Sequence, residues 1–178
     1  PDVEATEALG AALAHEVQRG DVIFLRGELG AGKTSLARGF LRRFFGSRTL
    51  DVPSPSYLLH FTYRGGEPAP PQCKDPKVIA VPESRENAAA EEDKTGQQNG
   101  AAVAVPIQVS DFSLVPGCDV HHVDPYRLPE GKIASLVDFE AVFMDVALVE
   151  WPERLGEQLV TAERPPRLEV CFEGFGPQ

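Results

Sequence analysis

Apolar residues along this chain follow two alternating patterns, short runs and helical stripes. The short runs predict β-strands at residues 22–25, 57–63, 119–124, 146–150 and 167–172. Helical spacing predicts helices at residues 6–19, 36–45, 132–143 and 152–159. In the first helix, Thr6 is the expected N-cap or first-turn residue, and the expected buried stripe is Leu9, Leu13 and Val17. Because strands and helices alternate, we expect an α/β fold with helices on both faces of a mostly parallel, mixed sheet.

Residues 64–117 break this pattern. They are rich in Pro, Ala, Gly, Glu, Gln and Asn, and they bury too little apolar surface to offset the entropy of ordering them. We therefore expect a low-complexity, disordered insertion at 64–117, in which residues 103–109 pair only transiently. Such an insertion is tolerated because loop-closure entropy grows slowly with loop length. Residues 1–178 are otherwise expected to form a single domain.

Length and composition argue against several classes of protein, among them nucleic-acid-coating, membrane-spanning and zinc-binding proteins. The 178 residues suffice for one α/β domain with a core of its own. A formal net charge of −10 argues against a protein that coats DNA or RNA, because phosphate neutralisation requires an excess of Lys and Arg. No apolar run is long enough to span a membrane, so no membrane partner is expected. The three cysteines lack C-x-x-C spacing, which argues against a zinc site and favours a reducing compartment.

The strongest motif is a phosphate-binding P-loop, G-x-x-x-x-G-K-[ST], at residues 27–34. It follows a predicted strand and opens a predicted helix, the context in which backbone N–H groups and a helix N-terminus bind phosphate. Lys33 is expected to reach the β- and γ-phosphates, and the Thr34 hydroxyl to bind Mg²⁺. The residues expected to contact the nucleotide here are Glu28, Leu29, Gly30, Ala31, Gly32, Lys33, Thr34 and Ser35. The alternative is a glycine-rich turn that only caps an ordinary helix.

Two acids stand at the carboxyl ends of predicted strands. Asp124 follows the strand at 119–124, and Glu150 ends the strand at 146–150. In an open α/β sheet these ends face the nucleotide, so one acid is expected to serve Mg²⁺ and the other to orient or deprotonate an attacking water. The sequence does not assign which acid does which. The alternative for each is a helix cap or a solvated strand end.

Other polar and aromatic residues allow two interpretations each. Trp151, the single tryptophan, is by base rates a core aromatic, whereas its position after Glu150 favours a place near the nucleotide. Ser54 and Ser56 flank a proline, either as turn residues or as a switch segment that responds to the γ-phosphate. His121 and His122 are adjacent on a strand and point to opposite faces, so they are not expected to share a metal.

Four blocks in order resemble the TsaE (YjeE) family. They are the P-loop and helix start at 27–40, Ser-Pro-Ser-Tyr at 54–57, His-Val-Asp-Pro-Tyr-Arg-Leu at 122–128, and Leu-Val-Glu-Trp-Pro-Glu at 148–153. The resemblance implies a three-layer P-loop NTPase-like fold and Mg²⁺-dependent ATP binding with weak intrinsic hydrolysis. It also implies an accessory role in forming N6-threonylcarbamoyladenosine at adenosine 37 of tRNA. The implied partner is a TsaB–TsaD complex, through which tRNA is reached indirectly.

The family pattern also assigns roles residue by residue. The catalytic positions are Lys33, Asp124 and Glu150, the metal positions are Thr34, Asp124 and Glu150, and the positions near the nucleotide outside the P-loop are Thr6 and Trp151. The switch-like hydroxyls are Ser54 and Ser56. Asp124 is followed by Pro125 where the family usually has Leu, which stiffens the backbone beside a candidate ligand.

The 64–117 insertion is foreign to the compact bacterial members of this family and hints at a eukaryotic version. We expect a cytoplasmic protein, or a plastid or mitochondrial one if the source is eukaryotic. Two other functions stay open. A small-metabolite kinase would use Asp124 on the acceptor hydroxyl and Arg127 on the transferred charge, although the insertion is poor in the arginines of a kinase lid. A non-catalytic, nucleotide-gated scaffold would bind ATP without turnover.

Overall fold

A computed structural model describes residues 2–65, 105–110, 112–157, 159 and 167–173. Its centre is a six-stranded sheet in the order β3-β2-β4-β5-β1-β6. The strands are β1 (Val22–Gly27), β2 (His60–Gly65), β3 (Val105–Ser110), β4 (Val120–Val123), β5 (Val146–Glu150) and β6 (Arg167–Phe172). All neighbouring strands are parallel except β2 and β4, which are antiparallel. The prediction of a mostly parallel, mixed sheet is confirmed.

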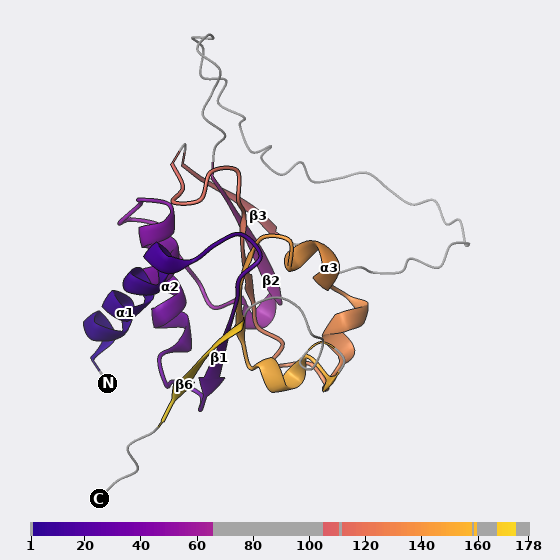
Figure 1. Cartoon of the computed structure of the whole chain (residues 1–178). Helices are drawn as coiled ribbons and strands as arrows, with labels where there is room; N and C mark the ends of the chain where they lie inside the picture. The colour runs from indigo at the N-terminus through magenta and orange to yellow at the C-terminus, as the bar shows by residue number, and fades with distance from the viewer. Residues whose placement is uncertain (1, 66–104, 111, 158, 160–166, 174–178) are drawn as a thin grey trace, which may run out of the picture.

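Helices cover both faces of this sheet (Figure 1). On one face lie α1 (Val3–Glu16) and α2 (Lys33–Phe44), and the core there includes Leu36, Phe40, Phe44, Tyr63 and Leu148. The other face carries the 3-10 turn η2 (Lys132–Ser135) and α3 (Phe139–Val142), and its core includes Phe24, Val123, Ile133, Phe139 and Val149. The result is a three-layer α/β fold with helices on both faces of the sheet, as predicted.

The first helix differs from its prediction. It begins at Val3, and its N-cap is Asp2, whose carboxylate accepts a hydrogen bond from the Glu4 N–H; Thr6 lies one turn further on. Leu9 is 49% exposed, so the predicted apolar stripe is wrong there. The buried positions of α1 are instead Gly10 and Ala14.

Helices α1 and α2 pack against each other through glycines. A Cβ added at Gly10 would lie 2.1 Å from the Leu36 carbonyl oxygen, and one added at Gly39 would lie 2.0 Å from the Glu7 carbonyl oxygen. The two helix backbones therefore touch directly, which leaves no room for a larger side chain between them. A search for large apolar residues misses such an interface.

Two further element boundaries depart from the predictions. The strand expected at 57–63 starts at His60, because residues 55–57 form a 3-10 turn, η1, and Leu59 has a left-handed backbone with φ of 67°. The helix expected at 132–143 is split, because the Asp138 side chain accepts hydrogen bonds from the Glu140 and Ala141 N–H groups and starts α3 anew.

The predicted insertion at 64–117 extends too far at both ends. Residues 64 and 65 belong to β2, residues 105–110 form β3 paired in parallel with β2, and residues 112–117 are a described connection. Backbone pairing can order a segment whose composition carries little apolar signal. Residues 66–104 lie outside the described residues, so disorder there stays a prediction. No helix within the described ranges is long and apolar enough to cross a bilayer.

Candidate functional site

The glycine-rich loop at residues 27–34 joins the carboxyl end of β1 to the first turn of α2. Gly32, the N-cap of α2, has φ of 108°, a conformation that L side chains rarely adopt. At Gly27 an added Cβ would lie 2.7 Å from the Cβ of Phe172 on β6. The loop is therefore held tightly against the sheet, and the first N–H groups of α2 point toward the space above it.

Lys33 is buried at the start of α2. Its ammonium donates hydrogen bonds to the Gly27 and Glu28 carbonyl oxygens, at 2.7 and 2.9 Å, and lies 3.9 Å from the centre of the Trp151 ring. Burial lowers the pKa of Lys33, while the carboxylates of Glu150 and Asp124 oppose that shift. The loop carbonyls and the indole face thus hold the cation at the mouth of the loop.

Glu150 ends β5, the strand directly beside β1, where it pairs with Leu25. Its Oε1 accepts hydrogen bonds from the Thr34 hydroxyl at 2.8 Å and from His122 Nε2 at 2.9 Å. Burial alone raises the pKa of Glu150, but the contacts with His122, Thr34 and Lys33 together lower it below its usual value. These contacts therefore favour the ionised form of Glu150, although the residue itself is only 3% exposed.

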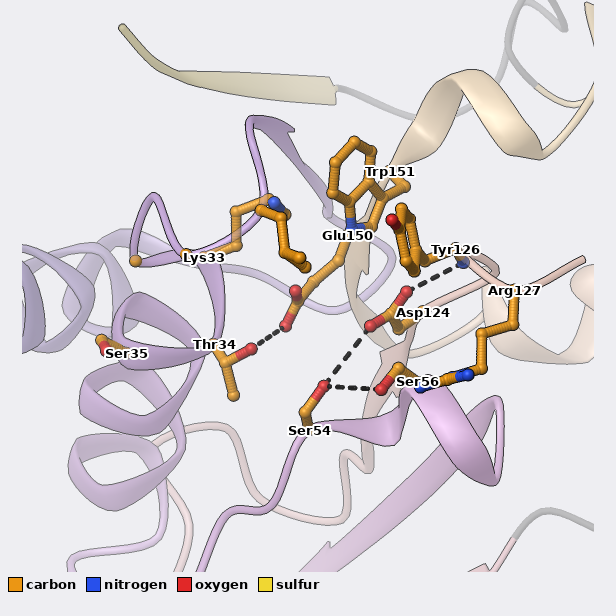
Figure 2. Close-up of a pocket in the computed structure, with 13 residues that line it drawn as sticks. Lys33, Thr34, Ser35, Ser54, Ser56, Asp124, Tyr126, Arg127, Glu150 and Trp151 are labelled. Atoms are coloured by element: carbon orange, nitrogen blue, oxygen red, sulfur yellow. Dashed lines mark hydrogen bonds between the residues drawn. The ribbon is translucent and has the colours of Figure 1, made fainter. Parts of the chain in front are cut away.

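Asp124 follows β4, one strand further along the sheet. Its Oδ1 accepts from the Tyr126 N–H at 2.9 Å, and its Oδ2 accepts from the Ser54 hydroxyl at 3.4 Å (Figure 2). Burial raises the pKa of Asp124, the nearby charge of Glu150 adds to that shift, and the Tyr126 hydrogen bond opposes it. The two acids thus differ, because environment pushes one pKa down and the other up.

Trp151 is not a core aromatic, so the interpretation favoured by base rates is wrong. Its backbone is left-handed, with φ and ψ both 53°, and it is partly exposed beside Lys33. The Tyr126 ring lies against it, with ring centres 4.7 Å apart. A left-handed conformation is costly for a residue other than glycine and is often found at functional sites.

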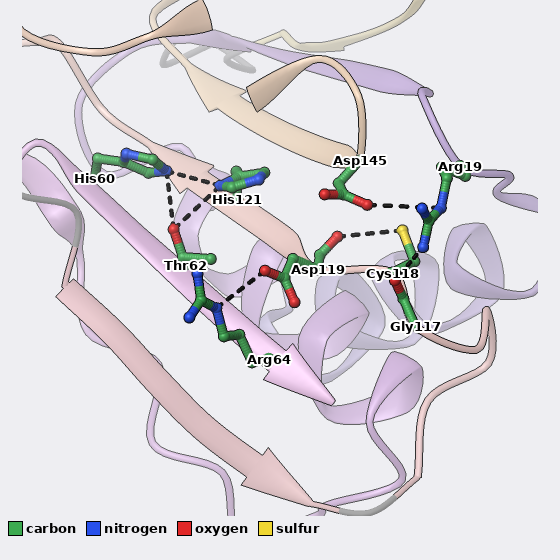
Figure 3. A network of polar contacts seen from close by, with 9 residues as sticks. All are labelled: Arg19, His60, Thr62, Arg64, Gly117, Cys118, Asp119, His121 and Asp145. Carbon is green, nitrogen blue, oxygen red and sulfur yellow. Dashed lines mark hydrogen bonds and ion pairs between the residues drawn. The ribbon is translucent and has the colours of Figure 1, made fainter. Parts of the chain in front are cut away.

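His121 and His122 point to opposite faces of the sheet, as predicted. His122 faces Glu150, whereas the His121 ring lies with His60 and Thr62 on β2 (Figure 3). The ring nitrogens His60 Nε2 and His121 Nδ1 are 2.9 Å apart, and Thr62 Oγ1 lies 3.1 Å from His121 Nδ1. Burial lowers the pKa of both histidines to about 4, so this second cluster is uncharged at neutral pH.

A cavity of about 280 Å³ lies over the P-loop (Figure 2). It is lined by Leu29, Gly30, Gly32, Lys33, Thr34, Ser35, Ser54, Ser56, Asp124, Tyr126, Arg127, Glu150 and Trp151. Segments from four separate parts of the chain meet here, at the carboxyl ends of β1, β4 and β5. This is where open α/β sheets bind their ligands.

The chain is similar in sequence to proteins of known families. The family model for "Threonylcarbamoyl adenosine biosynthesis protein TsaE" matches residues 1–73. A Synechocystis protein called "tRNA threonylcarbamoyladenosine biosynthesis protein TsaE" is 43% identical over 67 residues, which are 38% of this chain and 41% of the relative. The Mycobacterium tuberculosis protein of the same name is 28% identical over 180 residues, covering 95% of this chain and 76% of the relative. The comparisons confirm the resemblance to the TsaE family.

The match is uneven along the chain. The chain spans about two fifths of the Synechocystis TsaE relative, and 42% of the Mycobacterium leprae relative, which is 44% identical over 72 residues. Among solved structures, Bacillus subtilis YdiB is 19% identical with a TM-score of 0.46, covering 98% of this chain and 74% of the other. The short matches thus have a higher identity than the match that covers most of the chain.

Most of the site residues predicted from the sequence meet at the cavity. The exceptions are Thr6, Glu28 and Ala31, which do not line it. Thr6 lies beside the loop, because a Cβ added at Gly32 would be 3.4 Å from its methyl group. The hydroxyls of Ser54 and Ser56 lie 3.3 Å apart at the edge of the cavity.

Sequence reasoning missed His122 and Tyr126 and assigned Arg127 only to the kinase hypothesis. Tyr126 and Arg127 directly follow Asp124 and Pro125, so their position in the block was the available signal. Arg127 lies over the Tyr57 ring, 4.1 Å from its centre, and lines the cavity. His122 was hidden because its contact with Glu150 depends on the pairing of β4 with β5.

The oxygen atoms of Thr34, Glu150 and Asp124 form the donor set that hard cations such as Mg²⁺ prefer. Among the described residues, no group of three or more His, Cys, Asp or Glu side chains is placed to hold a metal ion. This donor set therefore fits Mg²⁺ only when phosphate oxygens or waters supply further ligands.

Proposed function

We propose that this chain binds ATP with Mg²⁺ and hydrolyses it as an accessory subunit in forming N6-threonylcarbamoyladenosine at adenosine 37 of tRNA. The observation that carries the proposal is the hydrogen bond from the Thr34 hydroxyl, in the first turn of α2, to Glu150 at the end of β5, the strand beside β1. In P-loop ATPases these are the positions of the hydroxyl and the acid that hold Mg²⁺. The TsaE relatives, named for this modification, support the biological role.

Binding rests on the loop and the start of α2. Loop N–H groups and the helix N-terminus offer donors to the phosphate oxygens. Lys33 exchanges its carbonyl partners for phosphate oxygens, so its cation compensates the added negative charge. Thr34 and one of the two acids would hold Mg²⁺, which neutralises charge on the phosphates during transfer.

The two acids divide the remaining work. Glu150 is the low-pKa carboxylate on the strand next to the loop, which suits a metal ligand. Asp124 has a raised pKa and is held by Ser54 and the Tyr126 N–H, which suits a group that orients a water or accepts its proton. Ser54 and Ser56 connect this acid to the β2 side of the cavity and form the proposed switch segment.

The test combines calorimetry with hydrolysis. The chain should bind ATP more tightly with Mg²⁺ than without it, and should hydrolyse it slowly alone. Addition of a TsaB–TsaD complex, with and without tRNA, should raise the rate severalfold or more. Binding with no stimulated turnover would favour the nucleotide-gated scaffold, and transfer of phosphate to a small acceptor would favour the kinase. Absence of ATP binding would overturn the proposal.

A further inference from the structure

His122 is a fully buried polar side chain that the proposed chemistry has not yet used. It lies on β4, is 0% exposed, and faces the same side of the sheet as Glu150. Its Nε2 lies 2.9 Å from Glu150 Oε1, whereas its Nδ1 has no hydrogen-bond partner among the described residues. Every polar contact of the ring is thus directed at one carboxylate oxygen.

The hydrogen-bond geometry defines the direction of donation. Glu150 Oε1 accepts from the Thr34 hydroxyl and lies 2.9 Å from His122 Nε2, so the proton of the second hydrogen bond is assigned to the ring nitrogen. A lone pair on the buried Nδ1, rather than an N–H without an acceptor, fits the lack of a partner there. The geometry therefore favours hydrogen on Nε2 of this imidazole.

Glu150 Oε1 accepts hydrogen bonds from two donors, and the proposed Mg²⁺ binding would remove one of them. Thr34 supplies the other, and its hydroxyl is the group that the proposed function assigns to Mg²⁺. Once Thr34 turns to the ion, His122 is the remaining donor of this pair. A carboxylate that is 3% exposed needs such a donor, because an unpartnered buried charge is strongly disfavoured.

We infer that His122 is a positioning residue that fixes Glu150 through Oε1 and so presents Oε2 to a divalent cation bound with the nucleotide. The inference rests on the proposed function, because it assigns Thr34 and Glu150 to that cation. It predicts that His122 governs how strongly Mg²⁺ tightens ATP binding, rather than ATP binding itself.

Three substitutions separate this role from simple core packing. His122→Gln places an amide nitrogen near the position of Nε2 and should preserve the donor. His122→Asn is equally polar but reaches only as far as Nδ1, and His122→Leu is apolar. For each variant and the unmodified chain, calorimetry gives the ATP dissociation constant with Mg²⁺ and with EDTA, and circular dichroism checks the fold.

The ratio of the two dissociation constants is the readout. We expect His122→Gln to stay within about threefold of the unmodified ratio, while His122→Asn and His122→Leu lose about tenfold or more, the loss typical of a hydrogen bond to a buried charge. Equal ratios for Gln and Asn in folded proteins would overturn the inference alone. An unmodified chain that binds no ATP would overturn the proposed function, and the inference with it.

A second measurement needs no nucleotide. Long-range ¹H–¹⁵N spectra of the four histidine rings, with His122 assigned by its absence in His122→Gln, should show the proton on Nε2. A proton on Nδ1 alone would mean that Nε2 cannot donate to Glu150, and would overturn the inference.

Discussion

The buried pair His60 and His121 makes a quantitative prediction about acid stability. Both side chains are less than 9% exposed, and their ring nitrogens lie 2.9 Å apart beside Thr62 (Figure 3). Burial is the largest cause that lowers their pKa from 6.5 to about 4, helped by the charge of the neighbouring histidines at His60 and of Arg64 at His121. The prediction concerns how much the free energy of unfolding changes when the pH falls from 7.0 to 5.5.

The direction of the change in the free energy of unfolding follows from which state binds more protons. Between pH 6.5 and 4 the unfolded chain holds protons on these two rings and the folded chain does not, so the free energy of unfolding falls with pH. Each histidine should cost about 1 kcal/mol over this range, and the pair about 2 kcal/mol. The contribution is complete above pH 6.5 and is lost as the pH approaches 4.

Urea unfolding of the unmodified chain and of the double variant His60→Gln, His121→Asn at both pH values measures this term. The amides take the places of Nε2 and Nδ1, so the hydrogen bond can persist without a titrating group. The raised pKa values of Asp119 and Asp124 act in the opposite direction in both proteins and cancel in the comparison. If both proteins lose the same stability between pH 7.0 and 5.5, the assignment of buried, neutral histidines is wrong.

Three further substitutions test the site and the helix interface. Lys33→Ala should reduce ATP affinity at least about 100-fold with an unchanged far-UV circular dichroism spectrum, and unchanged affinity by calorimetry would refute the P-loop assignment. Glu150→Ala should still bind ATP but lose partner-stimulated hydrolysis; if turnover persists at the original rate, Asp124 becomes the principal acid. Gly39→Ala should lower the free energy of unfolding by about 1–3 kcal/mol or more, because its Cβ would lie 2.0 Å from the Glu7 carbonyl oxygen. A change below about 0.5 kcal/mol in urea unfolding would show that the two helices separate easily.

The elements with strong local signals were predictable from the sequence. The runs at 146–150 and 167–172 coincide with β5 and β6 because their apolar or alternating patterns lie between clear breaks. The acids Asp124 and Glu150 were found because strand ends in a parallel sheet meet at one edge. Both inferences need only local pattern and a rule of sheet topology.

The features that the sequence did not predict depend on contacts between residues far apart in the chain. Leu9 was expected in the core, but the glycine contact between α1 and α2 turned that helix so that Gly10 is buried instead. The contact of His122 with Glu150 requires the register of β4 against β5, which no local pattern specifies. β3 was expected to pair only transiently, because its order comes from pairing with β2 and its own sequence contains a proline.

The contact of Gly27 with Phe172 has a consequence for synthesis. β1 pairs with β5 and β6, so the strand that leads into the P-loop is flanked by segments that follow it by more than about 100 residues. At the usual translation rate, Phe172 is made roughly 7–30 s after Gly27. During that interval the apolar strand is in the growing chain without its neighbours, a state prone to aggregation. The loop at residues 27–34 therefore reaches its place against the sheet only after the last strand has been made.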